Sequence, residues 1–203
     1  MSFNINDFIS QGLVEGGARP SLFQVSFAVP TGLNVETVGD LTATRQLSFL
    51  VQAASLPASL VDQIEVPYFG RRIKYSGERV FQDWTVSVLN DEDFAARDLF
   101  ETWSNSINSL VGNQTITPDL LAYKIANATV SQYGKGGDII RSYEFFGLWP
   151  KTVSDIRLDW SLANQMEVFE VQFALDYWVP ITVDGQTQNA TYTGLEENIV
   201  SVD

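Results

Sequence analysis

The sequence contains neither cysteine nor histidine among its 203 residues. Without cysteine, disulfide bonds and thiolate metal sites are excluded. Without histidine, the commonest general base and the commonest zinc ligand are missing as well. Catalysis would have to depend on carboxylates, lysine or tyrosine, and no nucleophile–base pair is recognisable. We therefore expect no catalytic residue, no metal site and no cofactor.

Basic residues are scarce, because 12 lysines and arginines stand against 25 acidic residues and the formal net charge is -13. A protein that grips duplex DNA or an anionic membrane shows the opposite balance. The four lysines are Lys74, Lys124, Lys135 and Lys151. Lysine commonly guards open strand edges, so its scarcity indicates, mildly, edges that pair between subunits.

Long apolar runs are also missing. No segment approaches the roughly 20 apolar residues of a membrane helix, and the first residues carry no basic secretory segment. We therefore expect a chain that is made and used as a soluble protein. The hydrophobic fraction of 45% predicts a real core. We divide the chain into an N-terminal arm (1–17), a β domain (18–179) and a C-terminal extension (180–203).

Strand patterns dominate what is present, and turn signals separate them at short intervals. Alternation is clearest over 80–89 and 167–179, where apolar side chains share one face. This pattern predicts a mainly β, antiparallel sandwich or barrel with one flanking α-helix. The predicted strands are Leu22–Val29, Leu47–Ala54, Gln63–Phe69, Arg71–Gly77, Val80–Leu89, Ala122–Tyr133, Ile139–Leu148, Thr152–Trp160 and Glu167–Val179.

The helix is predicted from about Glu92 to Leu110. Its apolar side chains recur at helical spacing and form one stripe. Asn90 or Asp91 is the predicted N-cap, and Gly112 stands where a C-cap glycine belongs. The stripe consists of Ala96, Leu99, Phe100, Trp103 and Ile107.

Four features have both a chemical and a structural interpretation, and we favour the structural one for each. Asp91–Asp93 resembles an acidic metal pair but fits the start of a helix. Gly134–Gly137 lacks the spacing of a phosphate loop and predicts a hairpin turn. Arg71–Lys74 is a small basic patch or, with better support, a salt-bridged surface. The five tryptophans predict core and interface packing better than a sugar-binding platform.

Several segments together carry a family resemblance over about Gly16 to Trp178. In order and spacing they resemble the tail tube proteins of contractile-tailed bacteriophages, and type VI secretion tube proteins are similar in architecture. The loop 31–45 and the extension 180–203 depart from that pattern. The matching segments are Ala18–Val25, Ala54–Ala58, Val66–Lys74, Gly77–Glu92, Gly147–Pro150, Leu158–Trp160, Phe169–Val171 and Ala174–Trp178.

The resemblance implies a structural subunit and not an enzyme. Such subunits form hexameric rings, hairpins from each copy join into one large β-barrel, and stacked rings conduct DNA during ejection. The implied partners are other copies, the tail sheath protein, baseplate and tail terminator proteins, a tape measure protein in the channel, and DNA that passes without specific binding. The implied location is the virion tail tube, assembled in the host bacterial cytoplasm.

The resemblance also implies core or interface roles for motif residues. We expect the hairpin 63–77 and the segment 47–54 to line the channel, with Glu65, Arg72 and Lys74 as candidate lining residues. Acidic side chains on the bore would repel phosphates and keep DNA sliding. The motif residues are Arg19, Pro20, Phe23, Pro57, Trp84, Asn90, Asp91, Trp103, Trp149, Pro150, Asp159, Trp160, Tyr177 and Trp178.

Alternative functions remain open at this point. A baseplate tube-initiator or junction protein would have the same fold but a low copy number in the particle. A tube subunit of a secretion or injection system is the next alternative. A carbohydrate-binding β-sandwich is a distant one, and a carboxylate-based hydrolase is more distant still because no paired acids are recognisable.

Overall fold

The computed structural model of the chain describes residues 16–28, 30, 47–116, 120–124 and 128–181. The predicted arm up to residue 15, the loop 31–45 and the extension from residue 182 onward lie outside these ranges. The predicted division of the chain into three parts therefore stays a prediction. In the part that the structure describes, no helix is both long enough and apolar enough to cross a membrane.

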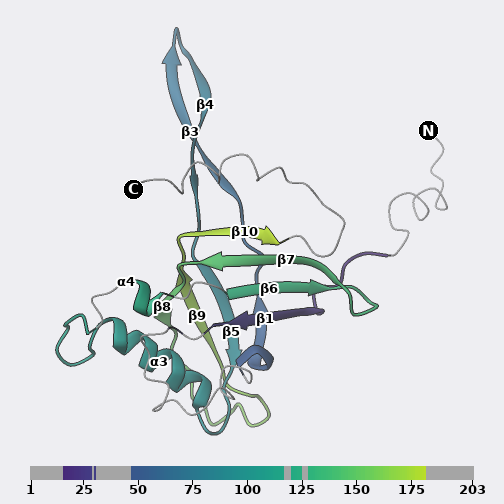
Figure 1. Ribbon diagram of the computed structural model, residues 1–203, viewed down its shortest axis with the longest axis vertical. Coiled ribbons are helices and arrows are strands. Elements are labelled where there is room, and N and C mark those ends of the chain that lie inside the picture. Colours follow the sequence, from purple (N-terminus) through teal and green to yellow (C-terminus); the bar gives the residue numbers. More distant parts are fainter. Residues whose placement is uncertain (1–15, 29, 31–46, 117–119, 125–127, 182–203) are drawn as a thin grey trace, which may run out of the picture.

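Two four-stranded antiparallel sheets form the body, and their strands run across one another (Figure 1). In the first sheet the order is β1 (Phe23–Phe27), β6 (Ala128–Tyr133), β7 (Ile139–Phe146) and β10 (Tyr177–Ile181). In the second it is β2 (Val51–Ala54), β5 (Trp84–Leu89), β9 (Val168–Ala174) and β8 (Trp149–Val153). The predicted antiparallel β fold is confirmed.

One buried cluster joins both sheets. On β5 the side chains alternate between buried and half-buried, as the sequence predicts for a strand with one covered face. The ring of Trp84 stacks on Phe145 of the first sheet at 4.3 Å between centroids, and its indole N–H donates to the Ser55 carbonyl at 2.7 Å. The cluster includes Val25, Phe27, Trp84, Val86, Val88, Phe100, Trp103, Val130, Phe145, Phe169, Val171 and Phe173.

The predicted flanking helix is present as α3 (Ala95–Ile107) and covers the cluster with its apolar stripe. The predicted caps are wrong. Phe94 is the N-cap residue, in a left-handed conformation and without a side-chain cap, and Asn108 is the C-cap. Asn90 is engaged elsewhere, since its amide donates to the Glu167 carboxylate at 2.9 Å. The helix therefore begins after a turn that the backbone closes, from Phe94 N–H to the Asp91 carbonyl at 3.1 Å.

The longest predicted strand, Glu167–Val179, is wrong as a single element. Strand β9 ends at Ala174, and the chain crosses to the other sheet before β10 begins at Tyr177. At the crossing, the Asp176 N–H donates to the Phe146 carbonyl at 3.0 Å, and Lys124 bonds the Asp176 carboxylate at 2.8 Å. Alternation continues through the crossing, so the sequence pattern could not reveal it.

Other predicted strands also have different limits. Of the predicted strand 80–89 only Trp84–Leu89 forms β5, since Val80 ends another strand and residues 81–83 belong to none. Residues 47–50 are helical, so only Val51–Ala54 of the predicted strand 47–54 is extended. A short helix, α4 (Leu120–Tyr123), stands where the prediction began a strand at Ala122. Strand β8 begins at Trp149 and ends at Val153, so the predicted strand 152–160 is mostly irregular.

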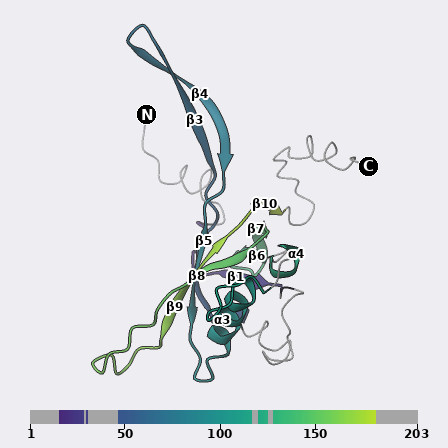
Figure 2. The same cartoon turned by 90° about the vertical axis from the view of Figure 1, so that its left-hand side faces the viewer.

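The remaining two strands, β3 (Leu60–Tyr68) and β4 (Arg71–Val80), form a separate hairpin. It reaches well beyond the body at one end of the long axis (Figures 1 and 2). Its two-residue turn has positive φ at both positions, 44° at Phe69 and 79° at Gly70, which is the backbone that a tight hairpin needs. The predicted hairpin is confirmed and is longer at its base than predicted.

Candidate assembly surfaces

The β3–β4 hairpin has one polar and one apolar face. The antiparallel register places Glu65 opposite Lys74 and Val66 opposite Ile73, and opposed residues share a face. The polar face carries Gln63, Glu65, Arg72, Lys74 and Ser76, together with Pro67. The apolar face carries Ile64, Val66, Tyr68, Ile73 and Tyr75, and ends in Arg71.

The apolar face of the hairpin is uncovered. Every residue of β3 is exposed, and Ile64 and Tyr75 each keep 56% of their surface open. Contiguous exposed apolar surface of this kind marks an interface. These residues were not predicted to form a surface, although side-chain alternation over 63–76 indicates one.

The polar face brings together the three predicted channel-lining side chains. The carboxylate of Glu65 lies 3.0 Å from the Arg72 guanidinium and 3.8 Å from the Lys74 ammonium. Gln63 donates to the same carboxylate at 3.2 Å. Basic groups outnumber acidic ones on this face, so the net negative charge expected of a channel face is not found here.

The second sheet of the body presents another polar surface. On its open face Thr85 lies opposite Gln172, and Ser87 lies opposite Glu170. The outer strands of this sheet are β2 and β8, and neither has a further neighbour within the described residues. Unpaired outer strands offer backbone N–H and C=O groups to a strand from another chain.

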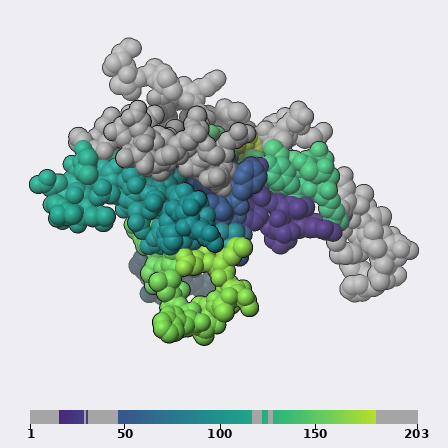
Figure 3. Space-filling model, turned by 90° about the horizontal axis from the view of Figure 1, so that it is seen from below, coloured from purple at the N-terminus to yellow at the C-terminus, as the bar shows by residue number. Residues whose placement is uncertain are grey.

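A second apolar surface lies at the opposite end of the molecule from the hairpin tip. Between β8 and β9, the segment 154–167 stands out from the body (Figures 2 and 3). Trp160 is fully exposed, and Leu158 and Met166 keep 79% and 78% of their surface open. At the other end, the hairpin tip exposes 91% of Phe69. The long axis therefore has an apolar surface at each end.

Asp159 holds the exposed turn that carries Trp160. Its carboxylate accepts the Ser161 N–H at 3.0 Å and the Ser161 hydroxyl at 2.7 Å, and Arg157 pairs with it at 3.0 Å. The Ser161 backbone bond, then the hydroxyl, and then Arg157 lower the pKa of Asp159 from its ordinary value of 3.8, against a small opposing effect of desolvation. Trp160 is thus presented by a turn with its own hydrogen bonds.

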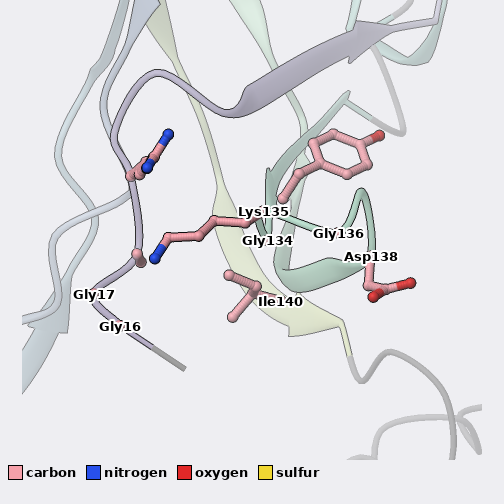
Figure 4. Close-up of a pocket in the computed structure, with 10 residues that line it drawn as sticks. Gly16, Gly17, Gly134, Lys135, Gly136, Asp138 and Ile140 are labelled. Atoms are coloured by element: carbon pink, nitrogen blue, oxygen red, sulfur yellow. The ribbon is translucent and has the colours of Figure 1, made fainter. Parts of the chain in front are cut away.

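A shallow hollow of about 370 Å³ lies between residues 16–19 and the turn of the β6–β7 hairpin. Figure 4 shows the Lys135 side chain reaching toward Gly16 and Gly17, while Asp138 points away from them. The predicted turn at Gly134–Gly137 is confirmed, because the Gly134 N–H donates to the Asp138 carbonyl at 2.7 Å. The turn is closed by hydrogen bonds between its own backbone groups, as expected for the end of a hairpin.

The predicted motif residues occupy three kinds of position. Trp84, Trp103 and Pro150 are buried, and the Trp103 N–H donates to the Tyr123 carbonyl at 2.7 Å. Phe23, Pro57, Asn90, Asp91, Trp149, Asp159 and Trp178 are half-buried. Arg19, Pro20, Trp160 and Tyr177 are exposed. The motif therefore combines core positions with surface positions, and the roles of the exposed ones stay predictions.

Chemistry of the enzymatic or metal-binding kind has little support in the part of the chain that is described. No group of three or more carboxylates that could hold a metal ion occurs there. Asp91–Asp93 lies just before α3. The carboxylates that are engaged, such as Glu65, Asp83 and Asp176, pair with lysine or arginine on the surface. The features that stand out are the exposed apolar surfaces and the unpaired outer strands.

The fold is similar to that of two solved tube-terminating proteins. The sheath/tube terminator of the extracellular contractile injection system PVC is similar, with a TM-score of 0.57 and 18% identity over 83% of this chain and 99% of that chain. The tube terminating cap of the anti-feeding prophage is similar as well, with a TM-score of 0.55 and 18% identity over 82% and 92% of the two chains. At this identity the likeness establishes the fold.

Sequence comparison identifies the family. The model of the phage tail tube protein family matches residues 18–180. Tail tube protein gp19 of Enterobacteria phage T4 is 38% identical over 162 residues, which cover 79% of this chain and 90% of that protein. The chain belongs to the phage tail tube protein family, whose members are structural components of the virion and not enzymes.

Proposed function

We propose that this chain is the main subunit of a contractile phage tail tube, in which hexameric rings stack and their channel conducts DNA during ejection. The observation that carries the proposal is the β3–β4 hairpin. Its apolar face has no cover within the described chain, while its other face is polar. Such a ribbon is stable when other copies cover the apolar side and water fills the other side.

Ring formation would use the outer strands of the second sheet. Pairing of β2 in one copy with β8 in the next is a head-to-tail contact, and such contacts close into a ring when the rotation allows it. Closure removes the open edges and makes one barrel that is wide enough for an aqueous bore. Thr85, Ser87, Glu170 and Gln172 would then continue the polar lining of the hairpin.

Stacking of rings would use the two ends of the long axis. Tyr68 and Phe69 at the hairpin tip are exposed, and so are Leu158, Trp160 and Met166 at the other end. Apolar surfaces at opposite ends of one molecule favour an open, repeating contact. This arrangement supports a tube and not a single ring.

A subunit of the tail tube would contact several other proteins of the tail. They are the sheath protein around the tube, baseplate and terminator proteins at its ends, a tape measure protein within it, and DNA that passes without specific binding. Assembly would take place in the host bacterial cytoplasm. The solved PVC sheath–tube complex, with a TM-score of 0.50 and 16% identity, supports a subunit of this fold next to a sheath.

A terminator or junction protein is the second candidate, because similar folds occur in the PVC terminator and the anti-feeding prophage cap. The 38% identity to the T4 tail tube protein favours the main subunit. Counting copies per particle by quantitative mass spectrometry separates the two. A main subunit is present in many rings, and a terminator or junction protein is present in one.

Negative-stain microscopy of the purified full-length chain tests the proposal. We expect rings and hollow rods whose number rises with protein concentration. Single small globules at every concentration would contradict it.

A further inference from the structure

The β3–β4 hairpin has a more basic balance than the rest of this acidic protein, because its four basic side chains stand against three acidic ones, Asp62, Glu65 and Glu78. Residues 60–80 contain four of the 12 basic side chains, Arg71, Arg72, Lys74 and Arg79, in a chain whose net charge is -13. Two of the four, Arg72 and Lys74, are on the polar face. A conduit for DNA that exposed these cations freely would attract phosphates.

Glu65 lies between these two cations. The register places it directly opposite Lys74, and Arg72 is next along the same face. Its side chain is 30% exposed, against 76% for Arg72 and 62% for Lys74. Gln63 donates a further hydrogen bond to it. Among the register pairs from Gln63 to Tyr68, Glu65 is the one acidic residue on this face; Asp62 and Glu78 lie at the bulge near the base of the hairpin and are not paired in the register.

We propose that Glu65 is a charge-masking residue, which holds Arg72 and Lys74 and prevents the polar face of the hairpin from binding the phosphate backbone of double-stranded DNA. The inference deepens the proposed function, on which its biological meaning rests. The role belongs to one side chain, Glu65, and the ligand that the polar face does not retain is double-stranded DNA.

The expected effect on DNA binding does not depend on how much the ion pair contributes to folding. An exposed ion pair contributes little to folding, so loss of Glu65 leaves the subunit folded. DNA binding is different, because its salt dependence grows with the number of phosphates that cations neutralise. One subunit therefore gains two phosphate-binding cations, and in a ring the cations freed in each subunit would add to one another on the same polyanion.

The test compares Glu65→Gln with the unchanged protein, using full-length subunits below the assembly concentration and a short fluorescent duplex DNA. We expect affinity to rise by about tenfold or more at low salt, and the slope of log affinity against log salt to steepen by about two, one for each freed cation. Glu92→Gln is the matched control. It removes the same charge at an exposed position before α3 and is expected to change little.

The variant Glu65→Gln/Arg72→Gln/Lys74→Gln identifies the source of the gain and is expected to return affinity to the starting level. Equal affinity of Glu65→Gln and the unchanged protein, or an equal gain in Glu92→Gln, would overturn the inference. Arg72→Gln/Lys74→Gln alone gives a second measurement that does not need Glu65→Gln to fold. It is expected to leave the weak DNA binding unchanged, and a clear loss would show that the cations were never masked.

Microscopy of the same variants above the assembly concentration separates the two proposals. Rods without a DNA effect of Glu65→Gln would contradict the masking role and leave the tube intact as a proposal. A DNA effect in a protein that never forms rods would support masking and contradict the tube.

Discussion

Strand β9 in the body and strand β3 in the hairpin have the same kind of sequence, with apolar and polar side chains in alternation. On β9, Phe169, Val171 and Phe173 are buried, because the other sheet and α3 cover them. On β3, Ile64 and Val66 are exposed because no part of the described chain covers them. Alternation therefore predicts that a strand has a face to bury, and it does not say which chain will bury it.

The largest expected effect is in the body. Phe173→Ala removes a ring that contacts Phe27, Trp84 and Phe100 within 6 Å between centroids. We expect the free energy of unfolding of the subunit to fall by about 3–5 kcal/mol. Denaturant titration of the free subunit measures it. A loss below about 1 kcal/mol would show that the body does not depend on its own core.

The next effect concerns the crossing between the two sheets. Gly147 has φ of 68°, and a Cβ there would collide with the Asp176 carboxyl group. We expect Gly147→Ala to destabilise the subunit by about 1–3 kcal/mol, because the added methyl group meets both a strained backbone and a fixed neighbour. Gly17→Ala is the control, since a Cβ there meets nothing within 4 Å. Equal thermal stability of the two variants would contradict this account of the crossing.

The hairpin gives a smaller effect on the subunit and a large one on assembly. Ile64 and Gln63 are neighbours on opposite faces, so Ile64→Thr and Gln63→Thr form a matched pair. We expect both to change the stability of the free subunit by no more than about 0.5 kcal/mol. Only Ile64→Thr should abolish rods, as judged by sedimentation and microscopy. A normal yield of rods from Ile64→Thr would contradict the claim that other copies cover the apolar face of the hairpin.

The smallest expected effect is the pH response of the segment 154–167. The pKa of Asp159 is lowered in the folded chain. The ionised carboxylate therefore stabilises the turn fully above the unfolded pKa, and this stabilisation is lost as pH falls through the folded pKa. We expect the protection of the Ser161 amide, relative to its intrinsic exchange rate, to fall as pH drops below 3.8 and to be low at all pH values in Asp159→Asn. Exchange at Ser161 that is independent of pH, after correction for its intrinsic rate, would contradict this origin of the turn.

Much of the fold could be predicted because it depends on local patterns. The apolar stripe of α3 follows from helical spacing, and the hairpin turn at Gly70 follows from the backbone freedom of glycine. The positive φ of Phe69 beside it does not follow from backbone preference. The crossing at Leu175–Asp176 could not be predicted, because side-chain alternation continues through it while the hydrogen-bond partners change. The predicted N-cap at Asn90 was wrong because the partner of its side chain is distant in sequence. The Asn90 amide donates to Glu167, and local spacing could not indicate this bond.

The candidate surfaces were predictable in part. Glu65, Arg72 and Lys74 were expected on one hairpin, and their register brings them together. The two basic residues among these three already predicted a weakened negative field on that face, whereas the expectation of an acidic bore came from the net charge of the chain, which does not give its distribution. The exposed state of Trp160 could not be predicted either, since a tryptophan in a patterned segment is as consistent with a core as with an interface.

A cryo-electron microscopy reconstruction of rods formed by the full-length chain tests the central claim most directly. The account predicts β2 of one copy paired with β8 of the next, and Glu65, Arg72 and Lys74 on the wall of the bore. It also predicts Ile64, Val66 and Tyr75 covered by neighbouring copies. Rods in which the apolar face of the hairpin stays open to solvent, or in which Glu65 faces outward, would contradict it.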